Sequence, residues 1–169
     1  MVEGIISKNQ SEYLSRENVR NIIEIAYKRL IENDRYLLEV DANERSITHR
    51  LAIYLEELFL GYDVDCEYNR DGIDSKKLKE FKEKVESDYN GETNVYPDII
   101  VHHRGEKENL IVIEAKKTSS SDFLDKEKLE IYKKELLYQF AYFVRFPVGD
   151  EFKNDKNISV QNFIEEIYW

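Results

Sequence analysis

Three charged residues interrupt two of the most apolar stretches of this sequence. Asp98 stands directly before Ile99–Val101, and Glu114 and Lys116 follow Leu110–Ile113. Charged side chains among residues that require burial are uncommon unless they pair with an opposite charge, bind a metal ion or line a site. These three residues are therefore the first candidates for chemistry.

The segment that joins the two apolar stretches predicts how the three charges are arranged. It reads RGEKEN, a polar sequence containing Gly105, which is typical of a turn between antiparallel strands. With a turn centred near residue 106, the numbers of cross-strand partners sum to about 212, so Asp98 lies opposite Glu114 and shares its face. Side chains alternate along a strand, so Lys116 shares that face while Ile113 and Ala115 point the other way. The sequence thus predicts that three charges meet on one patch of a hairpin.

Such a patch is suited to metal-assisted hydrolysis. Two carboxylates held close together repel each other unless a cation or a proton lies between them. Mg²⁺ in proteins takes one or two carboxylates, water and substrate phosphate oxygens, and the backbone carbonyl of Ala115 can add another oxygen. Lys116 can hold the attacking water and stabilise charge that develops on the phosphate. Asp98, Glu114 and Lys116 therefore indicate Mg²⁺-dependent phosphodiester hydrolysis, with Mn²⁺ as a substitute.

A purely structural role is the alternative for the same residues. In that interpretation the hairpin lies at a sheet edge, and Asp98 and Glu114 form solvated salt bridges with neighbouring lysines or with Arg104. The predicted convergence of the three charges favours the functional interpretation.

A fourth carboxylate, Glu44, precedes the hairpin on an expected helix. It lies in line with Ile47 and Leu51 on the apolar face of that helix. Two interpretations have equal weight. Glu44 is a further metal ligand, or it completes a capping box in which Asp41 is the N-cap residue.

Other charged residues receive weaker functional interpretations. Asp65 or Glu67, on the strand expected after that helix, either joins the acidic cluster or faces water. His102 shares the face of Asp98 and either approaches a substrate or faces water at the strand end. Four lysines alternate with acidic residues along a later helix and are interpreted as its solvated face; they are Lys126, Lys128, Lys133 and Lys134.

The elements that must position these residues follow from the apolar periodicity. Helices are expected over residues 17–32, 44–60 and 122–136, and strands over 62–70, 97–103, 109–116 and 137–148. Residues 74–92 form a polar insertion, and the C-terminal element, 157–169, favours a helix over a strand. This order predicts an α/β sandwich with a mixed sheet and a core of about 43–148.

Composition limits the possible classes of protein. A chain of 169 residues without repeats or linkers is expected to form one domain, 1–169. Because there is one cysteine, no membrane-length apolar run and no secretion signal, the expected location is the cytoplasm. The formal net charge of −10 argues against non-specific coating of DNA. A nuclease remains compatible with it, because bound cations offset carboxylates, and a homodimer or larger complex can supply basic surface.

The arrangement resembles the PD-(D/E)xK nuclease superfamily, which has the restriction-endonuclease-like fold. The matching residues are Pro97-Asp98 and Glu114-Ala115-Lys116, on two consecutive apolar strands. The match extends from about Asn43 to Phe146, with the order helix, strand, hairpin, helix, strand. The resemblance implies a three-layer sandwich with a mixed central sheet and flanking helices.

The same resemblance implies a function. It implies Mg²⁺-dependent cleavage of nucleic acid, with DNA favoured over RNA, in which Asp98 and Glu114 bind the metal and Lys116 is the catalytic lysine. Many members also carry an acidic residue in the helix before the sheet, which here corresponds to Glu44. The alternative is a catalytically silent module of the same fold that binds nucleic acid or a protein partner. Divalent-metal binding distinguishes the two.

Overall fold

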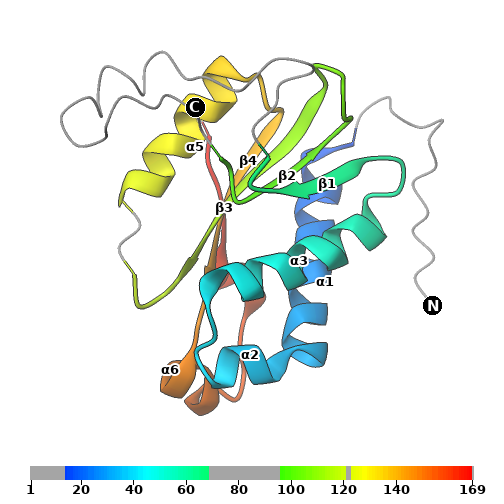
Figure 1. The fold of residues 1–169 in the computed structure, drawn as a ribbon. Helices are drawn as coiled ribbons and strands as arrows, with labels where there is room; N and C mark the ends of the chain where they lie inside the picture. The colour runs from blue at the N-terminus through cyan, green and yellow to red at the C-terminus, as the bar shows by residue number, and fades with distance from the viewer. Residues whose placement is uncertain (1–13, 69–95, 121–122, 169) are drawn as a thin grey trace.

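The computed structural model describes residues 14–68, 96–120 and 123–168. Within these ranges, helices lie against both faces of a five-stranded mixed sheet (Figure 1). The predicted α/β class with a mixed sheet is confirmed. The predicted insertion at 74–92 lies outside the described residues.

Two helices that pack together cover one face of the sheet. α1 (Arg16–Asn33) begins at Ser15, whose side chain accepts a hydrogen bond from Asn18 N at 3.2 Å. Its buried residues recur at helical spacing, as do those of α3 (Glu44–Leu58). Both helices were predicted within two residues at each end. The short α2 (Arg35–Glu39), which connects them, was not predicted.

The strands are β1 (Asp63–Cys66), β2 (Ile99–His102), β3 (Asn109–Lys117), β4 (Phe140–Phe146) and β5 (Ile164–Glu166). They lie in the order β1-β2-β3-β4-β5, and each neighbouring pair is antiparallel except β3 and β4, which are parallel. α5 (Phe123–Glu135) is the crossover between those two parallel strands.

The hairpin has the predicted register near the candidate site. Ile99 pairs with Ile113, Ile100 with Val112 and Val101 with Ile111. A bulge after Val101 shifts the register by one residue, so that His102 pairs with Asn109. The pairing that matters for Asp98 and Glu114 is therefore as predicted.

Alternate residues of the hairpin enter two different cores. Ile99, Ile113 and Ala115 belong to the larger core, which contains the buried residues of α1 and α3. Ile100 and Val112 belong to a smaller core with residues of α5. The predicted direction of Ile113 and Ala115 is confirmed. α5 covers the face of the sheet that carries the smaller core (Figure 1). Strand alternation places Glu114 and Lys116 on that same face.

The predicted C-terminal helix is wrong. The segment instead forms a 3-10 turn, η1 (Val160–Phe163), followed by β5. β5 pairs with β4 along Tyr142–Val144, and Ile167 N donates to Ala141 O at 2.9 Å. A free strand edge next to an ambiguous apolar segment offers backbone hydrogen bonds, and these decide in favour of a strand. A short helix, α6 (Gly149–Asn154), precedes η1 and was also not predicted.

The helices of the described ranges are too short or too polar to cross a lipid bilayer. This agrees with the absence of a membrane-length apolar run in the sequence.

Candidate functional site

Two carboxylates cap the end of β3 where β2 has stopped. The β2–β3 ladder ends at the pair Ile99 and Ile113, whereas β3 continues to Lys117. Beyond that pair, Ala115 N donates to Asp98 Oδ2 at 2.8 Å, and Lys117 N donates to Glu44 Oε2 at 3.0 Å. The short length of β2 therefore brings Asp98 and Glu44 to the same strand end.

Glu44 does not take part in the predicted capping box. Asn43 is the N-cap residue of α3, and its side chain accepts from Arg45 N at 2.9 Å. Glu44 is the first residue of the helix, and its carboxylate reaches β3 instead. Asp41 has a positive φ of 52° and accepts a hydrogen bond from Lys117 Nζ at 2.8 Å. The capping interpretation is wrong, whereas the role of Glu44 as a metal ligand stays a prediction.

Glu114 is the most deeply buried charged residue of the site. It is 3% exposed, and its Oε1 atom has no hydrogen-bond partner among the described residues. Burial, with the nearby charge of Asp98, raises the pKa of Glu114 well above its ordinary value. Burial of a carboxylate oxygen without a hydrogen-bond partner destabilises the ionised form of the side chain. A bound proton or a nearby cation would stabilise Glu114.

The pKa of Asp98 is also raised, but less than that of Glu114. Burial raises its pKa to about 6, against the opposing effects of the hydrogen bond from Ala115 N and the charge of Lys128. The charges of Glu44 and Asp125 contribute to the rise. Asp98 and Glu114 are therefore two coupled acids that resist simultaneous ionisation when no cation is bound.

Lys116 lies on the face predicted for it and is held by a residue that sequence reasoning missed. Its Nζ atom is 3.2 Å from Asp125 Oδ2, in the first turn of α5. Partial burial alone would lower the pKa of Lys116, but the hydrogen bond and charge of Asp125 outweigh it and raise the pKa. Lys116 is therefore a fixed cation at neutral pH.

Lys128 also belongs to this site, contrary to its interpretation as part of a solvated face. Its Nζ atom lies 3.1 Å from Asp125 Oδ1 and 3.9 Å from Glu114 Oε2. Asp125 and Lys128 are three residues apart, so they share one side of α5. That spacing was visible in the sequence, but nothing in the sequence showed that this side of α5 would face Glu114.

The charges of the cluster do not balance. Among the described residues, four carboxylates, Glu44, Asp98, Glu114 and Asp125, face two ammonium groups, Lys116 and Lys128. The formal excess is two negative charges, the charge that one divalent cation would neutralise.

The described side chains do not form a ready-made metal site, although they include suitable ligand atoms. Among residues 14–68, 96–120 and 123–168, no three His, Cys, Asp or Glu side chains are grouped so as to hold a metal ion. Asp98 and Glu44 each use one oxygen on a backbone N–H, which leaves one for another partner. The unpartnered Glu114 Oε1, these oxygens and the Ala115 carbonyl are donors of the type that Mg²⁺ requires. The residues therefore fit a hard divalent cation by donor type and charge.

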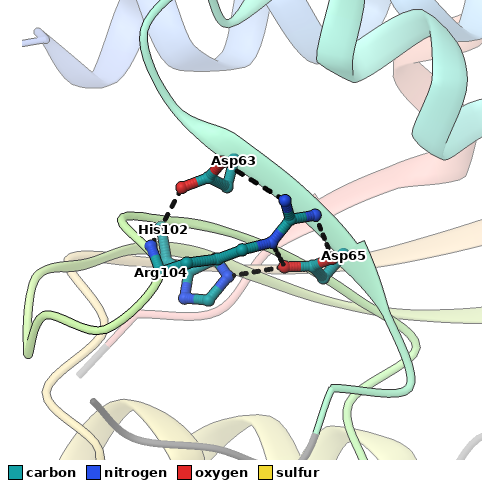
Figure 2. A network of polar contacts seen from close by, with 4 residues as sticks. All are labelled: Asp63, Asp65, His102 and Arg104. Carbon is teal, nitrogen blue, oxygen red and sulfur yellow. Dashed lines mark hydrogen bonds and ion pairs between the residues drawn. The ribbon is translucent and has the colours of Figure 1, made fainter. Parts of the chain in front are cut away.

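Asp65 belongs to a separate network with Asp63, His102 and Arg104, at β1 and the end of β2 (Figure 2). Arg104 donates to both oxygens of Asp65, at 2.6 and 2.8 Å, and His102 Nε2 lies 2.9 Å from Asp65 Oδ2. Glu67 pairs with Arg45 at 3.0 Å. His102 is 2% exposed, so the interpretation in which it faces water is wrong. Glu67 N donates to Asp98 O at 3.3 Å, but among the described residues neither the Asp65 nor the Glu67 carboxylate pairs with a side chain of the Asp98–Glu114 cluster.

Comparisons of this protein with known protein families, with curated proteins and with solved structures found no match.

Proposed function

We propose that this protein hydrolyses phosphodiester bonds of nucleic acid, with DNA favoured over RNA, at the site of Asp98, Glu114 and Lys116. One observation carries the proposal. Glu114 Oε1 is buried without a hydrogen-bond partner beside a second carboxylate and a fixed lysine. Stable folds seldom retain such a group without a role, and shifted acid–base groups concentrate at functional sites.

Asp98, Glu114, the Ala115 carbonyl and Glu44 would hold the Mg²⁺ ion, or Mn²⁺ in its place. N–H and C=O of one residue point to the same side of a strand, so the Ala115 carbonyl faces the side from which Asp98 binds Ala115 N. A bound divalent ion lowers the pKa of a coordinated water and polarises a phosphate oxygen. The positive charge of such an ion would favour the ionised forms of Asp98 and Glu114, which burial disfavours.

Lys116 acts as a positive charge rather than as a base. Its raised pKa keeps the amine protonated, which is the form that donates hydrogen bonds. Asp125 restrains the ammonium group, so that it is oriented before a substrate arrives. From this position Lys116 orients the attacking water and stabilises charge on the phosphate in the transition state.

An acidic protein that cleaves an acidic polymer needs a source of attraction. The net charge of −10 opposes the approach of nucleic acid. A homodimer or a larger complex would supply basic surface that this chain lacks in bulk.

A second candidate is a catalytically silent module that binds nucleic acid or a protein. The observation that favours it is Lys128, whose ammonium group lies by Glu114 where a metal ion would otherwise balance the charge. In that case the ammonium group of Lys128 balances the charge of Glu114 and the site binds no metal ion.

The test is cleavage of single- and double-stranded DNA and RNA while Mg²⁺ or Mn²⁺ is titrated. Wild type is compared with Lys116→Ala and with Lys126→Ala, a control on α5 whose side chain pairs with Glu165 at 2.7 Å. Metal-dependent cleavage by wild type and the control, but not by Lys116→Ala, supports the nuclease. No cleavage of any substrate and no metal bound by wild type supports the silent module.

A further inference from the structure

Lys128 has an environment unlike that of an ordinary surface lysine. It is on α5, which packs on β3 and β4. Its side chain is 31% exposed, and its ammonium group lies between Asp125 Oδ1, at 3.1 Å, and Glu114 Oε2, at 3.9 Å. The stem thus passes through a packed region, and only part of the side chain reaches water.

Lys128 supplies a positive charge next to the buried carboxylate of Glu114. An ionised carboxylate that is almost completely buried needs a nearby cation. Among the described residues, Lys128 forms the ion pair with Glu114. Lys116, two residues along β3, is directed to Asp125 instead. The hydrogen-bond partners of the site leave Glu114 Oε1 unpaired, so Lys128 compensates the charge without satisfying every oxygen.

We propose that Lys128 is the internal counter-cation of the Asp98–Glu114 pair, and that a divalent cation bound by this pair displaces its ammonium group. The second half rests on the proposed function. A divalent ion and an ammonium group repel each other strongly at the distance of a shared carboxylate. Lysine has a flexible four-carbon stem, and Asp125 remains as a partner once the contact with Glu114 is lost.

The counter-cation role is tested without any metal by a double-mutant cycle of Lys128→Met and Glu114→Gln. Unfolding in urea is measured in the presence of EDTA. Lys128→Met alone should lower stability because it leaves Glu114 without its cation. The same substitution should have a much smaller effect when residue 114 is Gln, which gives a coupling of about tenfold in the unfolding equilibrium constant.

Lys126→Met is the matched control for this cycle. It removes a lysine from the same helix, but one that pairs with Glu165 rather than Glu114. Its effect should add to that of Glu114→Gln. Lys128→Arg retains the charge and should keep most of the coupling.

Displacement is tested by calorimetric Mn²⁺ binding at pH 8.5, where protons compete least for the carboxylates. Removal of a positive charge next to the site should make Lys128→Met bind Mn²⁺ about fivefold more tightly than wild type. Lys128→Arg and Lys126→Met should bind like wild type.

Each result has a distinct meaning. An additive Lys128–Glu114 cycle overturns the counter-cation role. Coupling together with unchanged Mn²⁺ affinity in Lys128→Met overturns displacement. If neither wild type nor Lys128→Met binds Mn²⁺, displacement and the metal-dependent nuclease both fail, while the cycle still decides the counter-cation role. Metal binding by Lys128→Met alone supports the counter-cation role and overturns displacement, because Lys128 then excludes the metal ion from wild type.

Discussion

Two acidic clusters on the same sheet differ in whether their charges are matched. At β1 and the end of β2, His102 and the nearby Arg104 supply hydrogen-bond partners to both oxygens of Asp65. At the end of β3, Glu114 retains an oxygen with no partner among the described residues. Both clusters combine carboxylates with basic residues, so composition alone does not distinguish them.

The pKa shifts of the two clusters have opposite signs. Burial would raise the pKa of Asp65, but the hydrogen bonds and charges of Arg104 and His102 outweigh it, so the pKa is lowered. Burial raises the pKa of Glu114, and the charge of Asp98 adds to the rise, with only partial compensation from Lys128. Hydrogen bonds within the protein satisfy both oxygens of Asp65, whereas Glu114 Oε1 has no partner among the described residues. This difference is the main reason for assigning function to one and structure to the other.

The largest expected difference between the clusters is in cleavage. Asp98→Asn and Glu114→Gln should each reduce metal-dependent cleavage by about 10²-fold or more, because each removes a negative charge needed at the reaction centre. Asp65→Asn should cleave like wild type below its melting temperature. The measurement is the single-turnover cleavage rate of each variant on the nucleic acid that wild type cleaves. Equal losses in all three variants would contradict the distinction.

The pH dependence of stability should also separate the clusters. Asp98 has a pKa of about 6 in the folded protein, above the unfolded value of about 4. The folded state therefore binds more protons between these values, and the free energy of unfolding falls as pH rises from about 4 to about 6. The loss is about 3 kcal/mol at most. The lowered pKa of Asp65 has the opposite effect on stability. Its contribution to the free energy of unfolding is present above its unfolded pKa and is lost as pH falls through its folded pKa.

The measurement for this prediction is urea unfolding in EDTA from pH 4 to pH 8. Asp98→Asn should remove much of the decline between pH 4 and pH 6, while Asp65→Asn should not. A decline of unchanged size in Asp98→Asn would show that another group causes it.

Substitutions at the two clusters should change stability in opposite directions without metal. Asp65→Ala leaves buried His102 without its carboxylate and should lower the free energy of unfolding by roughly 2 kcal/mol. Glu114→Gln removes an incompletely paired buried charge and should raise it by about 1 kcal/mol. Chemical denaturation in EDTA measures both. A loss of stability in Glu114→Gln would mean that the carboxylate is already compensated.

The smallest expected effect lies within the matched cluster. Asp63 is 39% exposed and accepts from Arg104 N at 2.9 Å. An asparagine oxygen can accept the same hydrogen bond, so Asp63→Asn should cost only about 0.5 kcal/mol. An effect as large as that of Asp65→Ala would show that both carboxylates are needed to hold Arg104.

Much of the local architecture was predictable because it depends on neighbouring residues. The turn composition and the two apolar stretches predict the register of Ile99 to Val101 with Ile111 to Ile113, and the structure has that register. The predicted side of Ile113 and Ala115 is likewise found. The C-terminal strand was not predictable in this way, because its strand state depends on the free edge of β4. Glu166, buried on β5, pairs with Arg16 at 2.6 Å, and a buried glutamate obscures a strand pattern.

The sequence by itself determined the chemistry that can occur at the hairpin. It contained the carboxylates and the lysine, and strand alternation brought Glu114 and Lys116 to one face. Only the tertiary structure decided how these charges are compensated. The packing of α5 brings Asp125 and Lys128 to Glu114 and Lys116, and the short β2 leaves the N–H groups that Asp98 and Glu44 cap. Burial and long-range pairing set pKa values, and they arise from contacts between segments distant in sequence.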